Sequence, residues 1–257
     1  MTTPLDEEFA PAEESIGWAQ GATDELDSLI QRFFEGDVAE LVVEVDPDTG
    51  ENVQKIKFKS DIPKDFRRKA TEALNSARHS FDQSVFAARN ILGNRSAKGV
   101  NFPWATDPND LTHHLGSRDI DPRLWDTIRP HEPYPTSDKY LGGNDLIRTL
   151  ATIANNKHTV GLTVAGHLAE TRFPEVRMNG PFQVRMPRWD TRKNEIELIR
   201  CRGDIETKGE YRINFMICLK DTRLSQPTDA IGALRLFTQK AETVCKDIKA
   251  KCLELTQ

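Results

Sequence analysis

The sequence predicts an α+β protein in which a helical hairpin packs with an N-terminal β-hairpin, a C-terminal antiparallel sheet and a long C-terminal helix. Two observations lead to this prediction. Apolar residues repeat at helical spacing in four stretches and alternate with polar residues in several shorter ones. Prolines, glycines and asparagines gather between them. We predict one compact domain over 15–257, with a helical part over 15–160 and a β-rich part over 161–257.

Acidic residues concentrate at the start of the chain. The formal net charge is −5, but residues 1–50 contain fourteen Asp and Glu and one Arg, so they carry −13 and the remainder +8. Residues 1–14 are acidic, contain prolines and hold few apolar groups, so we predict a disordered acidic tail there. The other acidic residues indicate a solvated helix face, and an arm that masks the basic remainder is the alternative.

Composition also bears on location and redox state. No stretch approaches the roughly 20 apolar residues that cross a bilayer, and the N-terminus lacks the apolar run of a secretory signal. We therefore expect a cytoplasmic protein without membrane association. Because no two cysteines form a CxxC pair, we expect reduced thiols in the core and no zinc. The four are Cys201, Cys218, Cys245 and Cys252.

The first sixty residues predict a helix followed by a β-hairpin. Apolar residues recur at helical spacing over 16–34, and alternation on both sides of the turn at 46–50 indicates two paired strands. In that hairpin, Glu40 and Glu44 face the lysines of the returning strand. Such cross-strand pairs contribute roughly 0.2–1 kcal/mol each and favour this register.

Two long helices follow. Pro63 opens the first, over about 64–92, and the second covers about 144–158. The intervening segment, 93–143, is rich in Pro, Gly, Asn and Asp, and predicts an ordered loop with one short helix near 122–129.

After residue 160 the pattern changes to short alternating runs that predict strands. They lie near 164–168, 182–186, 196–198 and 211–219. A last helix covers about 229–255, with apolar residues spaced alternately by three and four. This spacing is typical of a coiled-coil seam, which would make a homodimer through this helix. We favour the alternative, a helix lying across the sheet.

Polar side chains cluster on the two long helices. On a helix, positions i, i+3, i+4 and i+7 share a face, and this spacing joins Asn75, Arg78, His79 and Asp82. Near the end of the second helix stand Asn155, Lys157 and His158. If the helices are antiparallel, the clusters meet, and Arg78 and Asp82 join Lys157 and His158 in one network. Such a network either pins the helices together or handles protons and binds anions.

The order of these segments resembles a family of uncharacterised bacterial proteins. In that family a helix reading roughly HNLRxALDH precedes a loop beginning FP, a segment close to LQPY and a helix ending DKHR. The resemblance covers about 16–160, where the matching segments are 74–83, 101–104, 128–134 and 154–158. Arg78, Asp82, Lys157 and His158 match the family motif. Five positions differ from the family motif. Asn75 and Gln83 stand where the family has His, Ser76 where it has Asn, Asn156 where it has Asp, and Thr159 where it has Arg.

The helical hairpin also looks distantly like HEPN domains, many of which are metal-independent ribonucleases. Their signature is an Arg followed four to six residues later by a His, whereas the Arg that precedes His158 here is Arg148. The resemblance implies a ribonuclease in which His158 is the general base. Lys157 and Arg78 then hold the phosphate, and Asp82 orients one of these cations.

A second basic group lies in the β-rich part. Residues 172–223 hold twelve Lys and Arg against eight Asp and Glu, with Arg188, Arg192 and Lys193 around a turn that follows Trp189 and precedes a strand. Basic residues beside an aromatic ring bind nucleic-acid backbones, and a solvated sheet face explains them as well. His113 and His114, beside Asp107 and Asp110, would be the candidate metal ligands, but adjacent histidines seldom point at one metal.

We predict an uncharacterised intracellular binding or regulatory module whose centre is the network of Arg78, Asp82, Lys157 and His158. Further binding candidates are Asn75, His79, Asn155, Arg188, Arg192 and Lys193. The alternative is the HEPN-like endoribonuclease. We expect no cofactor and no metal, because no phosphate-binding loop, dinucleotide fingerprint or nucleophile elbow is present. RNA and another protein stay open as partners.

Overall fold

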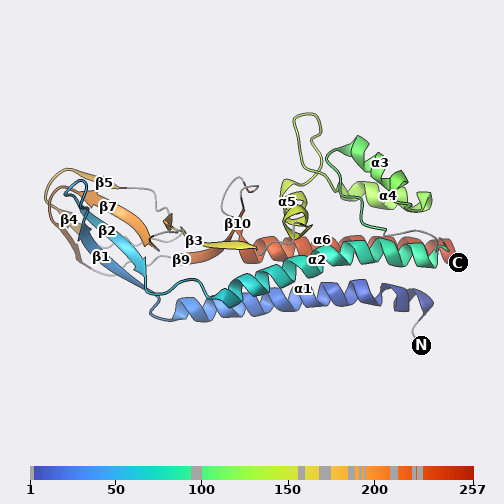
Figure 1. Ribbon diagram of the computed structural model, residues 1–257, viewed down its shortest axis with the longest axis horizontal. Coiled ribbons are helices and arrows are strands. Elements are labelled where there is room, and N and C mark those ends of the chain that lie inside the picture. Colours follow the sequence, from blue (N-terminus) through green and yellow to red (C-terminus); the bar gives the residue numbers. More distant parts are fainter. Residues whose placement is uncertain are drawn as a thin grey trace.

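The structure of this protein is a computed structural model with mixed helices and antiparallel sheets, which confirms the predicted α+β class. Figure 1 shows an elongated molecule with a helical bundle at one end and a β-sheet at the other. The described residues are 3–93, 100–155, 160–167, 175–184, 189–190, 193, 195–208, 214–221, 224 and 228–257.

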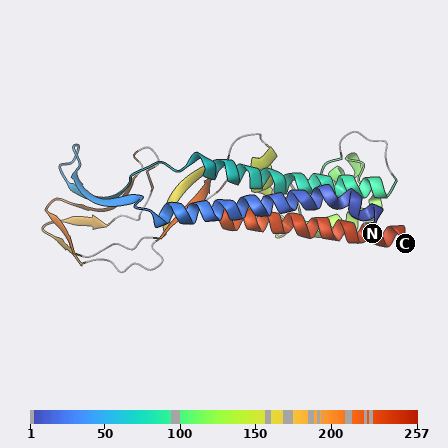
Figure 2. The same cartoon turned by 90° about the horizontal axis from the view of Figure 1, so that it is seen from below.

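Three long helices form the bundle: α1 (Pro4–Glu35), α2 (Lys64–Ile91) and α6 (Ala230–Thr256). They run side by side in both ribbon views (Figures 1 and 2). Each buries one apolar stripe against the other two, including Leu26 of α1, Phe81 of α2 and Phe237 of α6. This shared core is the frame on which the rest of the helical part rests.

The start of α1 corrects the prediction of a disordered tail over 1–14. Thr3 and Asp6 form a capping box, and Pro4 occupies the first turn. Phe9 and Ala12 are buried in the bundle, and the acidic side chains reach Lys249 of α6. The tail prediction was wrong because composition alone hid both the cap and the apolar stripe.

The seam of α6 is buried within the chain itself. Its residues face α1 and α2 in the bundle, so the favoured placement across the sheet was wrong. The buried residues of the seam are Leu234, Phe237, Ala241, Val244, Ile248 and Cys252. The homodimer through this helix stays a prediction, but these side chains are already covered.

The N-terminal hairpin joins the C-terminal strands in one sheet. Strands β1 (Ala39–Val45) and β2 (Asn52–Phe58) pair with each other, and β2 then pairs with β7 (Glu195–Cys201). Strands β5 (Phe182–Val184) and β6 (Trp189–Asp190) pair with β7 on its other side. Strands from before residue 160 therefore belong to the same sheet as strands from after it, and the helical and β-rich parts are not separated at that residue.

Of the two glutamates predicted to face the lysines of the hairpin, Glu44 forms ion pairs, and Glu40 is the register partner of Lys57. Glu44 of β1 contacts both Lys55 and Lys57 of β2, and the Lys55 Nζ lies 3.0 Å from the Glu195 Oε1 of β7. These contacts confirm the predicted register and extend it to a third strand.

Two smaller sheets complete the described β structure. Strands β3 (Gly161–His167), β9 (Asn214–Lys220) and β10 (Thr228–Asp229) form one sheet, close to the start of α6. Strands β4 (Glu175–Met178) and β8 (Ile205–Lys208) form the other.

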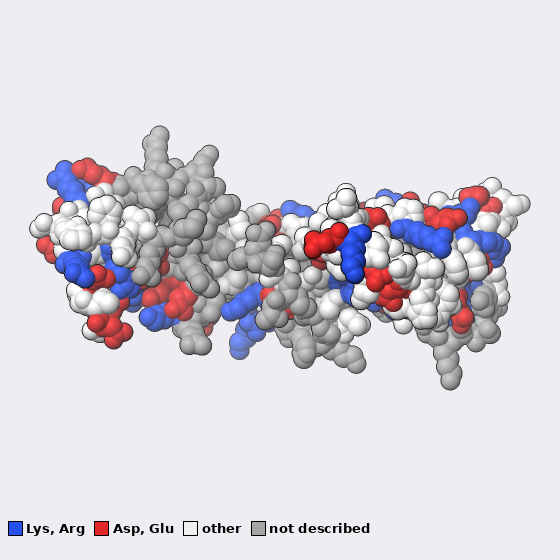
Figure 3. Space-filling view, turned by 90° about the horizontal axis from the view of Figure 1, so that it is seen from above, with Lys and Arg blue, Asp and Glu red and all other residues white. Residues whose placement is uncertain are grey.

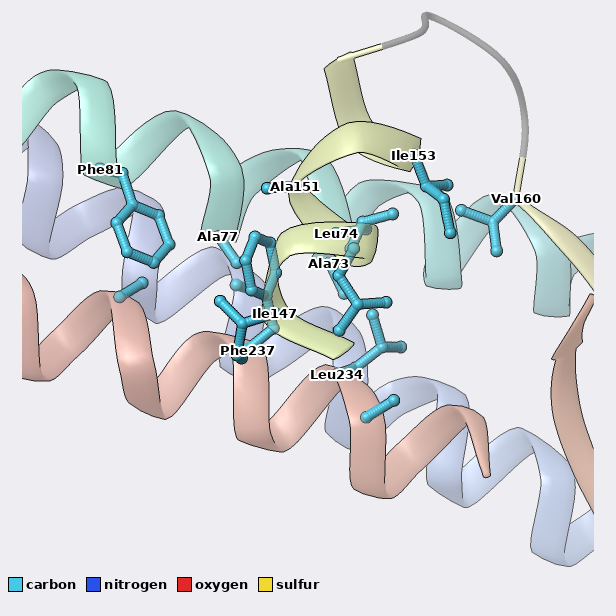
Figure 4. Packing of buried hydrophobic residues seen from close by; sticks show 14 of the residues in the cluster. Ala73, Leu74, Ala77, Phe81, Ile147, Ala151, Ile153, Val160, Leu234 and Phe237 are labelled. Atoms are coloured by element: carbon cyan, nitrogen blue, oxygen red, sulfur yellow. The ribbon is translucent and has the colours of Figure 1, made fainter. Parts of the chain in front are cut away.

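The segment predicted as a loop with one short helix contains more structure. Besides η1 (Pro122–Leu124), α4 (Trp125–Ile128) and η2 (Arg129–His131), it holds α3 (Pro108–Ser117), which Asp107 caps. The helix α5 (Asp145–Asn155) follows. Figure 4 shows how its Ile147 and Ala151 pack toward Ala77 of α2 and Phe237 of α6. Arg148 and Thr152, on the adjoining face of α5, lie toward the segment that contains Ala105.

The cysteines and helices give two further findings. All four cysteines are buried and unpaired, as predicted. None of the helices in the described ranges combines the length and the apolar character that crossing a membrane needs.

Candidate functional site

Arg78 and Asp82 lie one helical turn apart on the face of α2 that looks toward α5. The Nη1 of Arg78 donates to the Oδ2 of Asp82 over 2.6 Å, which confirms the predicted pair. The other carboxylate oxygen of Asp82 accepts the backbone N–H of Phe102 over 2.7 Å. Asp82 therefore fixes the path of the segment that crosses above α2, in addition to neutralising Arg78.

That segment brings a second arginine from α3. The backbone carbonyl of Phe102 accepts from the Nη1 of Arg118 over 2.5 Å. The carbonyl of Trp104, two residues later, lies 2.9 Å from the Nδ1 of His114. Because the chain from 102 to 106 is held to both helices, Arg118 is positioned next to Arg78.

A third arginine comes from α5. The Nε of Arg148 donates to the backbone carbonyl of Ala105 over 2.9 Å, and its Nη1 contacts the hydroxyl of Thr152. Arg148 and Thr152 are one turn apart on a face of α5 that adjoins the buried Ile147 and Ala151 stripe. The helical period of α5 thus directs this guanidinium toward the other two.

The three guanidiniums line one hollow of about 500 Å³, which we call the arginine hollow. Its remaining walls are polar or aromatic apart from Ala151: Asp82, Asn101, Trp104, Thr106, Asp110, His114, Ala151, Thr152 and Asn155. The guanidinium carbon of Arg78 stands 5.2 Å from the centre of the Trp104 ring, within cation–π range. A volume of this size is typical of small-ligand sites.

The carboxylates of the hollow already have donors. Asp110 accepts from the backbone N–H and the hydroxyl of Thr106, and its Oδ1 is 3.3 Å from the Nε2 of His114. Asp82 is occupied by Arg78 and the Phe102 N–H. The hollow therefore has three cations against two anions that are already engaged.

Two buried donors in the hollow have no hydrogen-bond acceptor among the described residues: the Nε of Arg78 and the Nε1 of Trp104. A buried donor without an acceptor costs about 1–3 kcal/mol. Both atoms therefore mark positions where an added acceptor would be stabilising.

The guanidiniums act on one another. Burial lowers the pKa of Arg148, and repulsion from Arg78 lowers it further, against the attraction of Asp110. Burial is also the main cause that lowers the pKa of Arg118; Asp82 opposes it and Arg78 adds to it. The charged forms are thus held under desolvation and mutual repulsion, both of which an anion in the hollow would relieve.

A second hollow of about 680 Å³ lies between α1, α2 and α5. It shares Arg78, Asp82 and Asn155 with the arginine hollow, so the two adjoin at these residues. Its other walls are Ser15, Trp18, Thr71, Asn75, Ser76, His79 and Ala154. We call it the tryptophan hollow, after the exposed Trp18 at its edge.

The structure brings together five of the predicted site residues. Asn75, Arg78, His79, Asp82 and Asn155 all line the tryptophan hollow. The prediction that the polar face of α2 meets the end of the next long helix is therefore confirmed as far as Asn155. Lys157, His158, Arg188 and Arg192 lie outside the described residues.

Lys193 is described, and it belongs to a different part of the molecule. It is an exposed turn residue that follows β6, and its backbone N–H donates to the Oδ1 of Asp190 over 3.2 Å. Figure 3 shows basic and acidic residues interspersed over the described part of the face it draws. The sequence reasoning placed Lys193 in a basic group, and its neighbours there are not described.

Sequence reasoning missed Arg118, Arg148 as a site residue, and Trp104 as the ring beside Arg78. The helix pattern identifies neighbours one turn apart, such as Arg78 and Asp82, but Arg118 reaches them only through the path of residues 101–106. One signal was available: Arg148 and Thr152 form a polar i, i+4 pair on an amphipathic helix.

The rings of His113 and His114, the metal candidates, lie 5.9 Å apart between centroids but have different surroundings. Both ring nitrogens of His114 face partners, Trp104 and Asp110, whereas His113 is exposed on α3. In the part of the chain that is described, no group of three or more His, Cys, Asp or Glu is placed to hold a metal ion.

Comparison with known proteins finds no matching family model, no matching curated protein and no matching solved structure. The resemblances to the uncharacterised bacterial family and to HEPN domains stay predictions. The two adjoining hollows are therefore the features of the described residues that bear on function.

Proposed function

We propose that this protein is a cytoplasmic binding module that holds a phosphate group in the arginine hollow. The observation that carries the proposal is the convergence of Arg78, Arg118 and Arg148 on one hollow whose carboxylates are already engaged. Guanidinium groups are the side chains best suited to phosphate recognition, because each presents several N–H donors in a fixed plane. Four buried, unpaired cysteines suit a reducing compartment.

Phosphate fits the hollow better than a carboxylate does. A carboxylate is planar and pairs with one arginine fork, whereas a phosphate has oxygens directed to several sides. The three guanidiniums come from α2, from the C-cap of α3 and from α5, so they approach from separate parts of the fold. The unpartnered Nε of Arg78 and Nε1 of Trp104 are further donors for the same group.

The network of Arg78, Asp82, Lys157 and His158 keeps a place in this proposal. Its described half, the Arg78–Asp82 pair, lines both hollows and is therefore not sealed in the core. In our proposal Lys157 and His158, two and three residues after Asn155, add basic groups to the same ligand.

A HEPN-like endoribonuclease is the second candidate, and one observation favours it. Arg78 and Asp82 face a hollow that also has the exposed imidazole of His79 in its wall. An open cation-lined hollow with an imidazole suits general acid–base cleavage of RNA. His114 does not serve as the base, since both of its ring nitrogens face partners.

The test is calorimetric titration of the purified protein with inorganic phosphate at constant ionic strength. We expect saturable binding that Arg148→Gln weakens about tenfold or more, because one charge-assisted contact of about 1.4 kcal/mol or more is lost. The matched control is Arg68→Gln, which removes an exposed arginine of the same helix as Arg78. Equal phosphate binding by the two variants, or none by the wild type, contradicts the proposal.

The ribonuclease candidate is separated by one further measurement. Incubation with single-stranded RNA shows cleavage by the wild type and none by His158→Ala if His158 is the base. A binding module leaves the RNA intact in both cases. Cleavage by the wild type would therefore replace the module with the enzyme.

A further inference from the structure

The tryptophan hollow contains a side chain that the fold does not explain. Trp18 is 60 % exposed on α1, although its neighbours Ala19 and Ala22 are buried in the bundle. An isolated exposed aromatic residue is ordinary. Trp18, however, stands at the edge of a hollow, among polar groups from two other helices.

The wall of this hollow also contains an unsatisfied polar atom. Ser15 is 1 % exposed, and its hydroxyl has no hydrogen-bond partner among the described residues. Ser15 and Trp18 are three residues apart on α1, so they share a face. The hydroxyl is therefore a buried donor and acceptor beside the exposed ring, and a ligand that enters the hollow can satisfy it.

The same hollow is also lined by groups that both donate and accept hydrogen bonds. Asn75 and His79 are exposed residues of α2, and Asn155 ends α5. Amide side chains match the alternating donors and acceptors of a heterocycle edge. Indole rings stack well on planar heterocycles such as nucleobases. This wall therefore has the elements of a site for a flat, polar ring.

We infer that the two adjoining hollows bind a nucleoside monophosphate, with the phosphate at Arg78, Arg118 and Arg148 and the base against Trp18. The inference rests on the proposed phosphate site and adds the chemistry of the rest of the ligand. Arg78, Asp82 and Asn155 belong to both hollows, so the part of the ligand that connects the phosphate to the base passes these three residues. The sugar that joins them lies there, beside the Asn155 amide.

The experiment compares two probes that share the phosphate and the sugar but differ in the base. The wild type is titrated with adenosine monophosphate and with ribose 5-phosphate at equal ionic strength. We expect adenosine monophosphate to bind about tenfold more tightly, within the range that stacking on one indole supplies.

The Trp18→Ala variant removes that preference, so that both probes bind it with the same affinity. The matched control is Phe86→Ala, because Phe86 is another exposed aromatic residue of the bundle and lies outside both hollows. The control keeps the wild-type preference.

The outcomes separate this inference from the proposed function. If ribose 5-phosphate binds and Arg148→Gln weakens it, but the base adds nothing, the nucleotide inference fails and the phosphate site stands. If neither probe binds, both fail. If the preference survives in Trp18→Ala, the base lies elsewhere and the inference is overturned. Binding of longer RNA without binding of the mononucleotide overturns it as well.

Discussion

The two ends of the molecule surround half-buried arginines in opposite ways. In the sheet, Arg200 of β7 contacts Glu197, Asp46 and Glu51, and hydrogen bonds to the first two raise its pKa. In the helical part, Arg118 and Arg148 have their pKa lowered by burial, with repulsion from Arg78 added. An arginine surrounded by carboxylates is part of the structure, whereas arginines gathered together are poised for an external anion.

The largest effect should come from Arg200→Gln. It leaves Asp46, Glu51 and Glu197 close together without their shared cation, so we expect the free energy of unfolding to fall by about 2 kcal/mol. Urea unfolding measures it. Arg148→Gln is the matched variant, and its loss should be below about 1 kcal/mol because relief of repulsion offsets the contact to Ala105. An equal loss of unfolding free energy in both variants would contradict the distinction between a structural arginine in the sheet and anion-binding arginines in the helical part.

Asp82→Asn should separate stability from binding at the arginine hollow. The substitution keeps an acceptor for the Phe102 N–H but removes the partner charge of Arg78, so we expect about 1–2 kcal/mol less stability. Because a carboxylate is replaced by a neutral amide, the net charge of the hollow becomes one unit more positive. Phosphate should therefore bind several-fold more tightly. Thermal unfolding and phosphate titration of the same sample check both directions. Weaker phosphate binding would indicate that Asp82 positions Arg78 for the ligand.

A buried histidine gives a pH-dependent version of the same comparison. Burial lowers the pKa of His131, with Lys240 adding to the shift and Asp247 opposing it. The unfolded chain therefore binds a proton more readily than the folded one. The stability from His131 is full above the ordinary pKa of 6.5 and is lost as the pH falls toward the lowered folded value.

The measured quantity is the melting temperature between pH 7 and pH 5. We expect the melting temperature of His131→Gln to fall less than that of the wild type over this pH range. The difference should correspond to less than about 1 kcal/mol of unfolding free energy. The exposed His79→Gln serves as the control and should leave the decline unchanged. An unchanged decline in His131→Gln would assign the pH dependence to other groups.

The smallest effect should come from Glu44→Gln in the hairpin. Glu44 contacts Lys55 and Lys57, but its side chain is 43 % exposed. Exposed pairs contribute about 0–1 kcal/mol and are screened by salt. We expect a loss below about 0.5 kcal/mol in dilute buffer that disappears in high salt, as measured by urea unfolding. A larger loss that persists in salt would place Glu44 with the buried network of Arg200.

The sequence was sufficient for features that depend on near neighbours. The hairpin, α2, α5 and the Arg78–Asp82 pair follow from period, turn residues and spacing, all of which act within a few residues. The beginning of α1 was missed although its signal is local, since the capping box of Thr3 and Asp6 was outweighed by acidic composition.

The arginine hollow depends on longer connections. Arg118 and Arg148 meet Arg78 only because backbone groups between 102 and 105 bond to Asp82, Arg118 and Arg148 in turn. No periodic pattern encodes the path of such a segment. The position of α6 was missed for a related reason: the same seam suits a second chain, a sheet or two helices, and only the whole fold selects among them.

The three-helix bundle also constrains the order of events during synthesis. Ala230, the first residue of α6, comes 195 residues after Glu35, the last residue of α1. While the ribosome is still making the strands between them, the apolar stripes of α1 and α2 have no third helix to cover them. Exposed stripes of this kind favour association with chaperones or with other nascent chains. The helix α5 lines both hollows and packs on Leu234 and Phe237 of α6. Both hollows can therefore form only after these two residues have been synthesised.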